Sequence, residues 1–348
     1  MSYSFFVAGG IMKKHILLSI IVLLSIHLIL TDSVSQSILV NTLPIMNINI
    51  EKTKRLSYVD ILNLNTEIFE EMPEDRVEED TNIDKEEIIY ENNEPKKEII
   101  DNSKEVTLEW KNILKNQTKY EIDIEKLKNE ELKFSLNKKG IDVLIYHTHA
   151  TESYTQSEGY EYEASGVFRT LNTDTSVIKI GNTLKSYLQR YGIGVYHDET
   201  LYDYPDYNLS YSKAGKAIPK LLKKYSDAKI VLDVHRDAIG VGTEQYKPIV
   251  KINGENVAQF LLVIGTNQGG LSHNNWRENL KLALKIKALA DEKYPGLCRY
   301  IILRKERFNQ HVTPGAMIVE MGATGNTIPE VERTSKYFSE LLNEVVSQ

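Results

Sequence analysis

The chain of 348 residues carries 42 Lys and Arg against 49 Asp and Glu, a formal net charge of −7, and it is 41% hydrophobic and 26% charged. This ordinary globular composition excludes a collagen and a wholly disordered chain, while the single cysteine, Cys298, excludes internal disulfides and cysteine-rich zinc fingers. Because no basic stripe with interleaved aromatic residues is present, no nucleic-acid partner is expected.

The first predicted element is a transmembrane signal anchor within residues 1–34. Residues 15–30 read HILLSIIVLLSIHLIL without any charged side chain, and extended to residue 34 they approach the ~20 apolar residues that cross a bilayer. Lys13 and Lys14 favour a cytoplasmic N-terminus. A cleaved signal peptide is the alternative, although no A-x-A-like cleavage site follows. Both interpretations export the rest of the chain, whether it starts at Met1 or at Met12.

Residues 35–135 are predicted to be an acidic, partly disordered spacer. Between residues 67 and 105, sixteen acidic residues face five basic ones, a net charge of −11 that leaves +4 for the remainder. Such a segment has too little apolar surface to order itself. A charged surface helix is the alternative, and either structure would separate the membrane from the domain that follows.

Residues 136–348 are predicted to form an α/β domain. Short apolar runs indicate strands, and apolar residues at helical spacing indicate helices, with Pro219 expected to break or kink the second helix. The alternation predicts a mostly parallel open sheet with helices on both faces. The expected strands are 143–147, 193–197, 230–235, 260–265, 300–303 and 316–321, and the expected helices are 175–191, 210–225, 275–292 and 328–346.

Polar side chains follow three of these strands. In open α/β sheets, ligands bind outside the carboxyl ends of the strands, so these side chains are expected to converge. Zinc hydrolases commonly use three nitrogen or oxygen ligands and leave one position open. His147 and His149, at the end of the first strand, would point the same way if the strand continued through them. The candidate metal ligands are His147, His149, Glu152 and His235.

Two further residues are predicted to be catalytic. Glu320 lies in the apolar run IVEM, where a carboxylate is costly to bury without a partner, and we interpret it as the group that takes a proton from water. Arg236 is expected to stabilise the developing oxyanion or to bind a substrate carboxylate. Asp237 either supports the site or ends a turn. The pattern indicates amide hydrolysis.

The sequence also resembles a known family. The stretches LIYHTHATESY (144–154), LDVHRDAIG (232–240) and RFNQHVTPGAMIVEMGATGNT (307–327), together with the single anchor, resemble stage II sporulation protein P of endospore-forming bacteria. The resemblance covers residues 140–348. It implies an amidase-like fold similar to zinc-dependent N-acetylmuramoyl-L-alanine amidases, cleavage between glycan strands and stem peptides, and endopeptidase cleavage of cross-links. It also implies stage II sporulation proteins D and M as partners.

Transferred to this sequence, the resemblance implies metal-site histidines in the HTH run and at His235, with Glu320 as the catalytic glutamate. The choice between the two HTH histidines stays open. The wider amidase group has a glutamate at the start of the next helix, where this sequence has residues 172–174 (NTD), so Glu152 is the candidate replacement. The residues implied to line a peptide-binding groove are Asn309, Gln310 and Asn326.

The predicted function is therefore that of a single-pass, membrane-anchored peptidoglycan hydrolase that uses Zn²⁺. Its catalytic domain is expected outside the cytoplasm at the sporulation septum, where it would remodel the wall during engulfment. Two alternatives are a wall-binding adaptor with a degenerate site and a zinc protease that acts on protein.

Overall fold

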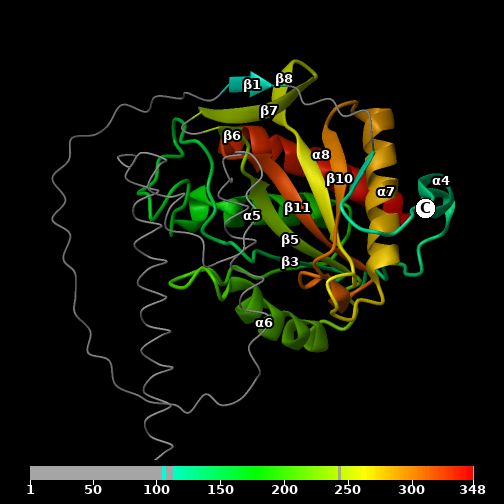
Figure 1. Cartoon of the computed structure of the whole chain (residues 1–348). Coiled ribbons are helices and arrows are strands. Elements are labelled where there is room, and N and C mark those ends of the chain that lie inside the picture. The colour runs from blue at the N-terminus through cyan, green and yellow to red at the C-terminus, as the bar shows by residue number, and fades with distance from the viewer. Residues whose placement is uncertain (1–103, 107–112, 242–243, 348) are drawn as a thin grey trace, which may run out of the picture. The chain divides into compact units, whose positions relative to one another are not determined.

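The framework of the fold is a seven-stranded sheet with the strand order β2-β10-β9-β11-β5-β3-β4 (Figure 1). The computed structural model describes residues 104–106, 113–241 and 244–347, which belong to a compact unit spanning residues 92–348. In chain order the strands of this sheet are β2 (Leu114–Asn116), β3 (Val143–Tyr146), β4 (Val195–His197), β5 (Ile230–Asp237), β9 (Phe260–Gly265), β10 (Cys298–Arg304) and β11 (Gly315–Ala323).

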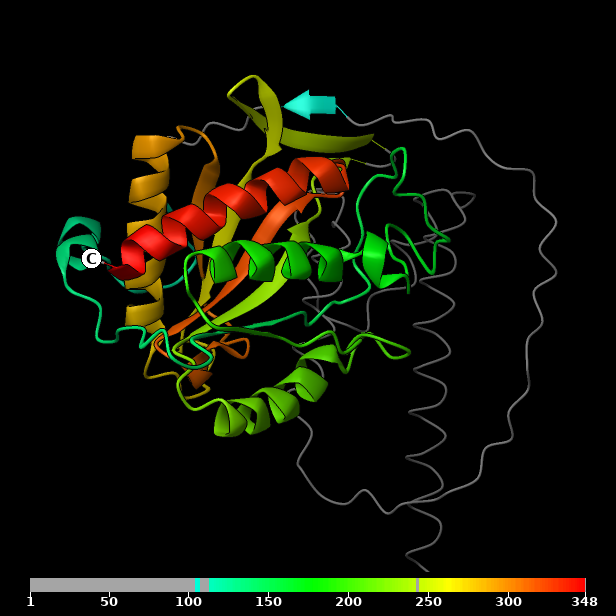
Figure 2. The same ribbon diagram turned by 180° about the vertical axis from the view of Figure 1, so that it is seen from behind.

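Three long helices cover one face of the sheet, as Figure 2 shows, and one helix covers part of the other. On the first face, side chains such as Ile145, Leu232 and Phe260 are fully buried against α5, α7 and α8. On the second face, Leu144 and Val231 pack against α6. The helices are α5 (Val177–Arg190), α6 (Ser210–Lys224), α7 (Trp276–Lys293) and α8 (Ile328–Ser347).

The predicted strands and helices of the α/β domain are confirmed, with shifts of a few residues at their ends. Pro219 lies inside α6 and does not end it. The prediction of a mostly parallel sheet is right in part: five of the six pairings are parallel, but β11 pairs with β9 in the antiparallel sense. The sheet is therefore mixed, because β9, β10 and β2 run opposite to the other four strands.

A small second sheet was not predicted from the sequence. It joins β1 (Lys104–Val106), β6 (Gly240–Val241), β7 (Glu244–Ile252) and β8 (Glu255–Ala258). The turn between β7 and β8 is Asn253-Gly254, both with positive φ (53° and 84°), which is the backbone of a tight hairpin turn.

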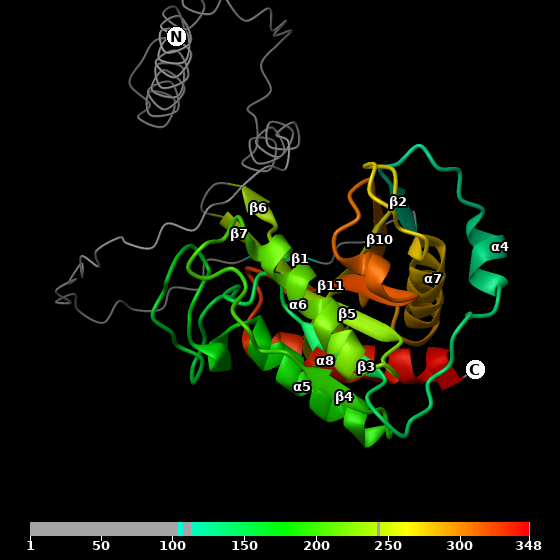
Figure 3. The same ribbon diagram turned by 90° about the horizontal axis from the view of Figure 1, so that it is seen from below.

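The start of the domain requires a correction. We predicted a spacer up to residue 135, yet β2 adds an edge strand to β10, and helix α4 (Ile124–Asn129) packs beside α7 (Figure 3). Leu127 of α4 belongs to the main hydrophobic core. The folded part therefore includes residues from at least Ile113 onward, because these apolar side chains are needed to cover α7.

The predicted anchor and most of the predicted spacer lie outside the described residues. Within the part of the chain that the structure describes, none of the helices has the length and apolar character that a membrane span requires.

The corrected domain start can be tested by truncating Leu127, which is 7% exposed. We expect Leu127→Ala to lower the free energy of unfolding by about 2–3 kcal/mol, because it leaves a cavity between α4 and the core. The control Lys126→Ala changes an exposed side chain of the same helix. Urea denaturation of the full chain measures both. If residues 113–135 were a spacer, the two variants would be equally stable.

Candidate active site

The pairing of β5 with β11 places His235 beside Glu320. The two residues are register partners in a parallel ladder, so their side chains project from the same face of the sheet. The ladder becomes irregular directly after this pair, where Gly322 has a positive φ of 70°. Such bulges occur next to active sites, where they end pairing and redirect side chains.

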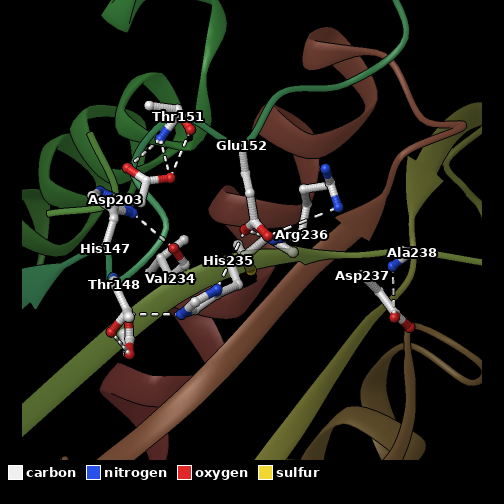
Figure 4. Close-up of polar contacts among 12 residues, drawn as sticks. His147, Thr148, Thr151, Glu152, Asp203, Val234, His235, Arg236, Asp237 and Ala238 are labelled. Carbon is white, nitrogen blue, oxygen red and sulfur yellow. Dashed lines mark hydrogen bonds and ion pairs between the residues drawn. The ribbon is translucent and has the colours of Figure 1, made fainter. Parts of the chain in front are cut away.

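His235 lies between two carboxylates (Figure 4). Its Nδ1 is 3.3 Å from Glu152 Oε2, and its Nε2 is 2.9 Å from Asp233 Oδ1. Burial would lower the pKa of His235, but Asp233 and Glu152 outweigh that effect and raise it well above its ordinary value. Asp233 is fixed in turn, because it accepts hydrogen bonds from Thr148 N (2.8 Å) and Thr148 Oγ1 (2.6 Å). Without a bound cation, His235 is therefore an imidazolium held by two anions.

His149 completes the group through aromatic contacts. Its ring stacks on Tyr207 at 4.3 Å, meets Tyr211 edge-on at 5.6 Å, and lies edge-on to His235 at 5.3 Å between ring centroids. Its Nδ1 is buried and has no hydrogen-bond partner. Burial lowers the pKa of His149 to about 4, so the ring is neutral and retains a lone pair for a Lewis acid.

Arg236 holds the loop that carries Glu152. Its Nε donates to Ser153 O (2.9 Å), its Nη2 donates to Phe168 O (3.2 Å), and its Nη1 is 3.8 Å from Glu152 Oε1. Burial would raise the pKa of Glu152, but Arg236 and His235 outweigh it and lower that pKa. In the structure the donors of Arg236 face main-chain carbonyls and Glu152, so Arg236 positions the loop of Glu152, while its predicted contact with an oxyanion or a substrate carboxylate stays a prediction.

Glu320 is the carboxylate that stays protonated. The residue is partly exposed, but its Oε2 is buried and unpartnered. Burial, opposed by His235, raises its pKa to about 8. A carboxyl group in this range exchanges a proton readily near neutral pH, which suits a group that first accepts and then donates one.

His147 does not join this group. His147 and His149 were expected to point the same way only if the strand continued through both. The strand ends at Tyr146 and the chain turns at residues 148–151, so the alternation of sides stops before His149. His147 faces α5, where its Nε2 is 2.8 Å from His197 Nε2. His197 of β4 is the buried partner of His147.

The three residues predicted to line a peptide groove have structural contacts instead. The Gln310 amide bonds Gly265 N (2.8 Å) and Val263 O (2.9 Å) of β9. The Asn326 amide bonds Ala323 N (2.9 Å) and Pro248 O (3.3 Å), and Asn309 Nδ2 donates to Tyr211 O (3.0 Å). All three side chains are buried, and their amides connect the elements that carry the site.

Several residues of the site were missed in the sequence. Asp233 lies two residues before His235 on one strand, so the period of two could have placed it on the same face. Asp203 accepts hydrogen bonds from Thr151 Oγ1 (2.6 Å) and Arg169 Nη1 (2.8 Å), and the Arg169 guanidinium lies over the Tyr207 ring at 4.4 Å. No local pattern predicts that the loop of Tyr207 meets the HTH turn, because the contact depends on the tertiary fold.

The donors in this group are imidazole nitrogen and carboxylate oxygen atoms, which are ligand types that zinc takes in hydrolases. Two ligands of a tetrahedral zinc ion lie about 3.3 Å apart when each is ~2.0–2.1 Å from the metal, and His235 Nδ1 and Glu152 Oε2 have this spacing. The free Nδ1 of His149 is a third donor from an adjacent ring. As the side chains stand, no group of three or more His, Cys, Asp or Glu among residues 104–106, 113–241 and 244–347 is closed around one metal position.

Fold and site together define an α/β protein with a buried histidine–carboxylate centre at the strand ends of an open, mixed sheet. The chain belongs to the stage II sporulation protein P family, whose profile matches residues 34–343. Stage II sporulation protein P of Bacillus subtilis (strain 168) is 24% identical over 214 residues, which are 58% of this chain and 50% of that protein. The chain thus spans about half the length of this curated relative.

The chain is also similar to solved structures of amidases. AmiC2 of Nostoc punctiforme is 12% identical, with 61% of this chain and 97% of that chain covered and a TM-score of 0.34. The CwlD amidase of Clostridioides difficile, solved in complex with the GerS lipoprotein, is 13% identical, with coverages of 59% and 96% and a TM-score of 0.35. These similarities concern the fold alone.

The buried pair of His147 and His197 predicts a pH dependence of stability. Burial lowers the pKa of both imidazoles, that of His147 to about 4, and the exposed Glu199 carboxylate lies 3.6 Å from His197 Nδ1. Above the ordinary histidine pKa of 6.5, both imidazoles are neutral in the folded and the unfolded chain, so they do not make the free energy of unfolding depend on pH. Below it the unfolded chain binds more protons than the folded one, so the free energy of unfolding falls by about 1.4 kcal/mol per pH unit for each histidine.

We therefore expect His197→Gln to flatten the dependence of unfolding free energy on pH between 7 and 4.5, by about 1 kcal/mol per pH unit. Denaturant titrations of the full chain at several pH values measure the slope. The control Glu199→Gln alters the neighbouring carboxylate and keeps the buried pair, so its slope should match that of the unchanged protein. Parallel curves for His197→Gln and the unchanged protein would contradict the assignment.

Proposed function

We propose that the chain is a peptidoglycan hydrolase, an N-acetylmuramoyl-L-alanine amidase with an additional endopeptidase activity on cross-links, that acts in septal wall remodelling during sporulation. The observation that carries the proposal is the convergence of His149, Glu152, His235 and Glu320 at one end of β5 and β11. Membership of the stage II sporulation protein P family supports sporulation as the setting. The apolar run at residues 15–30 supports attachment to the membrane. Stage II sporulation proteins D and M are the proposed partners.

His149, Glu152 and His235 would hold a zinc ion in this proposal. A bound zinc ion acidifies water and polarises a carbonyl group. Asp233 orients His235 from the opposite ring nitrogen, and Arg236 orients Glu152. Such outer contacts fix the direction of a ligand and raise its basicity.

Glu320 would carry the proton through the reaction. Its ionised form takes a proton from the attacking water, and its protonated form then donates that proton to the leaving amine of the stem peptide. Burial raises the pKa of Glu320 to about 8, which keeps both forms accessible near neutral pH. Glu320 and His149 are the partly exposed members of the group, which leaves this side of the site open to a polymeric substrate.

Replacing Glu320 by glutamine tests its role. Glu320→Gln preserves shape and removes the proton carrier, so we expect hydrolysis of purified sporangial wall to fall at least ~100-fold while bound zinc is unchanged. The control Glu306→Gln alters a carboxylate that pairs with Arg304 outside the site and should keep full activity. Undiminished hydrolysis by Glu320→Gln would show that another group moves the proton.

The product of the same assay identifies the reaction. Release of stem peptides with free amino-terminal alanine supports an amidase, and shortened cross-links support the endopeptidase activity. Wall binding without any product would favour the adaptor, whereas cleaved casein with intact wall would favour a protease.

Metal removal provides a separate test. We expect treatment of the full chain with a chelator to abolish hydrolysis and added Zn²⁺ to restore it, and we expect His149→Ala to retain less than a tenth of the zinc of the unchanged protein. Elemental analysis by mass spectrometry measures the zinc. The control His311→Ala changes a histidine that precedes β11, at the other end of that strand from Glu320, and should leave zinc content intact. Full activity in metal-free protein would exclude zinc.

A further inference from the structure

His147 and His197 form a buried pair on the face of the sheet opposite to the candidate active site. His147 is 0% exposed, its Nδ1 is 2.7 Å from Val234 O, and its Nε2 is 2.8 Å from His197 Nε2. We propose that His147 is a positioning residue, supported by His197, which fixes the main chain before His235 and so aims the His235 imidazole. The proposal rests on the proposed function, in which His235 is a ligand.

The first argument is that His147 replaces a missing strand donor. The pairing of β3 with β5 ends at Tyr146 and Asp233, so no further β3 residue continues the ladder. The next main-chain donor is diverted, because Thr148 N donates to Asp233 Oδ1 (2.8 Å). The His147 ring takes over by donating to Val234 O (2.7 Å). A buried carbonyl without this donor would be costly.

The position of that carbonyl determines the direction of His235. Val234 O belongs to the peptide plane that links Val234 to His235. Rotation of this plane would move the His235 side chain relative to Asp233 and Glu152, which lie 2.9 and 3.3 Å from its two ring nitrogens. Contacts with two carboxylates at these distances require a fixed backbone.

Only one assignment of donors and acceptors fits the hydrogen bonds of His147 and His197. A carbonyl only accepts, so His147 Nδ1 carries the proton, and in a neutral ring its Nε2 is then an acceptor. His197 must therefore donate from Nε2 and accept at Nδ1, which faces the Asn182 amide at 3.0 Å. A half-turn of that amide presents its NH₂ group. The chain of donors runs from Asn182 through His197 and His147 to Val234 O.

The main chain of α5 leaves room for the pair at one position. A Cβ atom on Gly181 would lie 2.4 Å from His197 Nε2 and 2.7 Å from His147 Nε2, closer than any real contact. Glycine inside a helix costs about 0.5–1 kcal/mol relative to alanine. Gly181 therefore lowers the stability of the helix at the position where the two imidazoles lie. This observation does not depend on the hydrogen bonds of the pair.

The test compares two replacements of His147 in the full chain. His147→Asn keeps a side-chain donor near the position of Nδ1, whereas His147→Leu removes it. We expect zinc affinity, measured by competition with a chromogenic chelator, to change less than ~3-fold in His147→Asn and to weaken ~10–100-fold in His147→Leu, the usual effect of losing an outer contact. If His147→Asn loses zinc as fully as His149→Ala, His147 is a ligand and the proposal fails.

A second measurement needs no metal. In the metal-free full chain, amide hydrogen exchange at residues 234–236 should be at least ~10-fold faster in His147→Leu than in His147→Asn, while exchange in β9 is unchanged in both. The control Leu188→Ala shortens a buried side chain of α5 two turns beyond Gly181. It should destabilise the domain without selectively accelerating amide exchange at residues 234–236. Equal exchange at residues 234–236 in all variants would overturn the proposal. If the unchanged protein binds no zinc, the proposed function fails, and this measurement still decides whether His147 fixes the strand.

Discussion

The pairing of β5 with β11 is the constraint on which the site depends. It brings His235 and Glu320 together from distant parts of the chain, and it aligns them on one face because they are register partners. Burying such groups without partners is unfavourable, so the surrounding structure must compensate. Asp233, Glu152 and Arg236 provide that compensation around His235. The buried atoms of this group without a hydrogen-bond partner are His149 Nδ1, His235 Nε2 and Glu320 Oε2, and His149 and Glu320 are its partly exposed residues.

The charges of this group balance in a way that suits a dication. The metal-free site holds the anions Glu152 and Asp233, the cations His235 and Arg236, and a protonated Glu320, so the formal sum is zero. Exchange of two protons, one from His235 and one from Glu320, for one divalent cation leaves that sum unchanged. The exchange would also free a lone pair on His235 and ionise the proton carrier, and both are required by the proposed reaction.

Much of the fold could be predicted because hydrophobic periodicity depends on local sequence. The runs that form β3 and β9 carry no charged residue, and those that form β5 and β11 begin with apolar residues before their charged site residues, as expected for strands covered on both faces. The direction of β9 relative to β11 could not be predicted, since a fully apolar strand has no pattern that reveals its neighbours. The β7–β8 hairpin could have been predicted from Asn253-Gly254 between alternating side chains.

The candidate site was predictable in its residue types and less so in their directions. His235 lies near both Glu152 and His149, because the carboxyl ends of parallel strands share one edge. His147 and His149 point in different directions because the strand ends at Tyr146, so the condition under which both would point the same way is not met. Which amides are free for substrate is decided by neighbouring main chain, so the roles of residues 309–326 could not be predicted from their polarity.

The two histidines of the HTH run, His147 and His149, lie on opposite faces of the sheet. His147 still follows the alternation of β3 and enters the apolar layer under α5, where burial keeps it neutral. His149 lies beyond the turn and enters the aromatic pocket of Tyr207 and Tyr211. A strand that continued through both would place two imidazoles on one face, and its main chain would then supply the donor that His147 supplies to Val234 O. The turn at residues 148–151 therefore separates a residue that holds the framework from one that is free to meet a ligand.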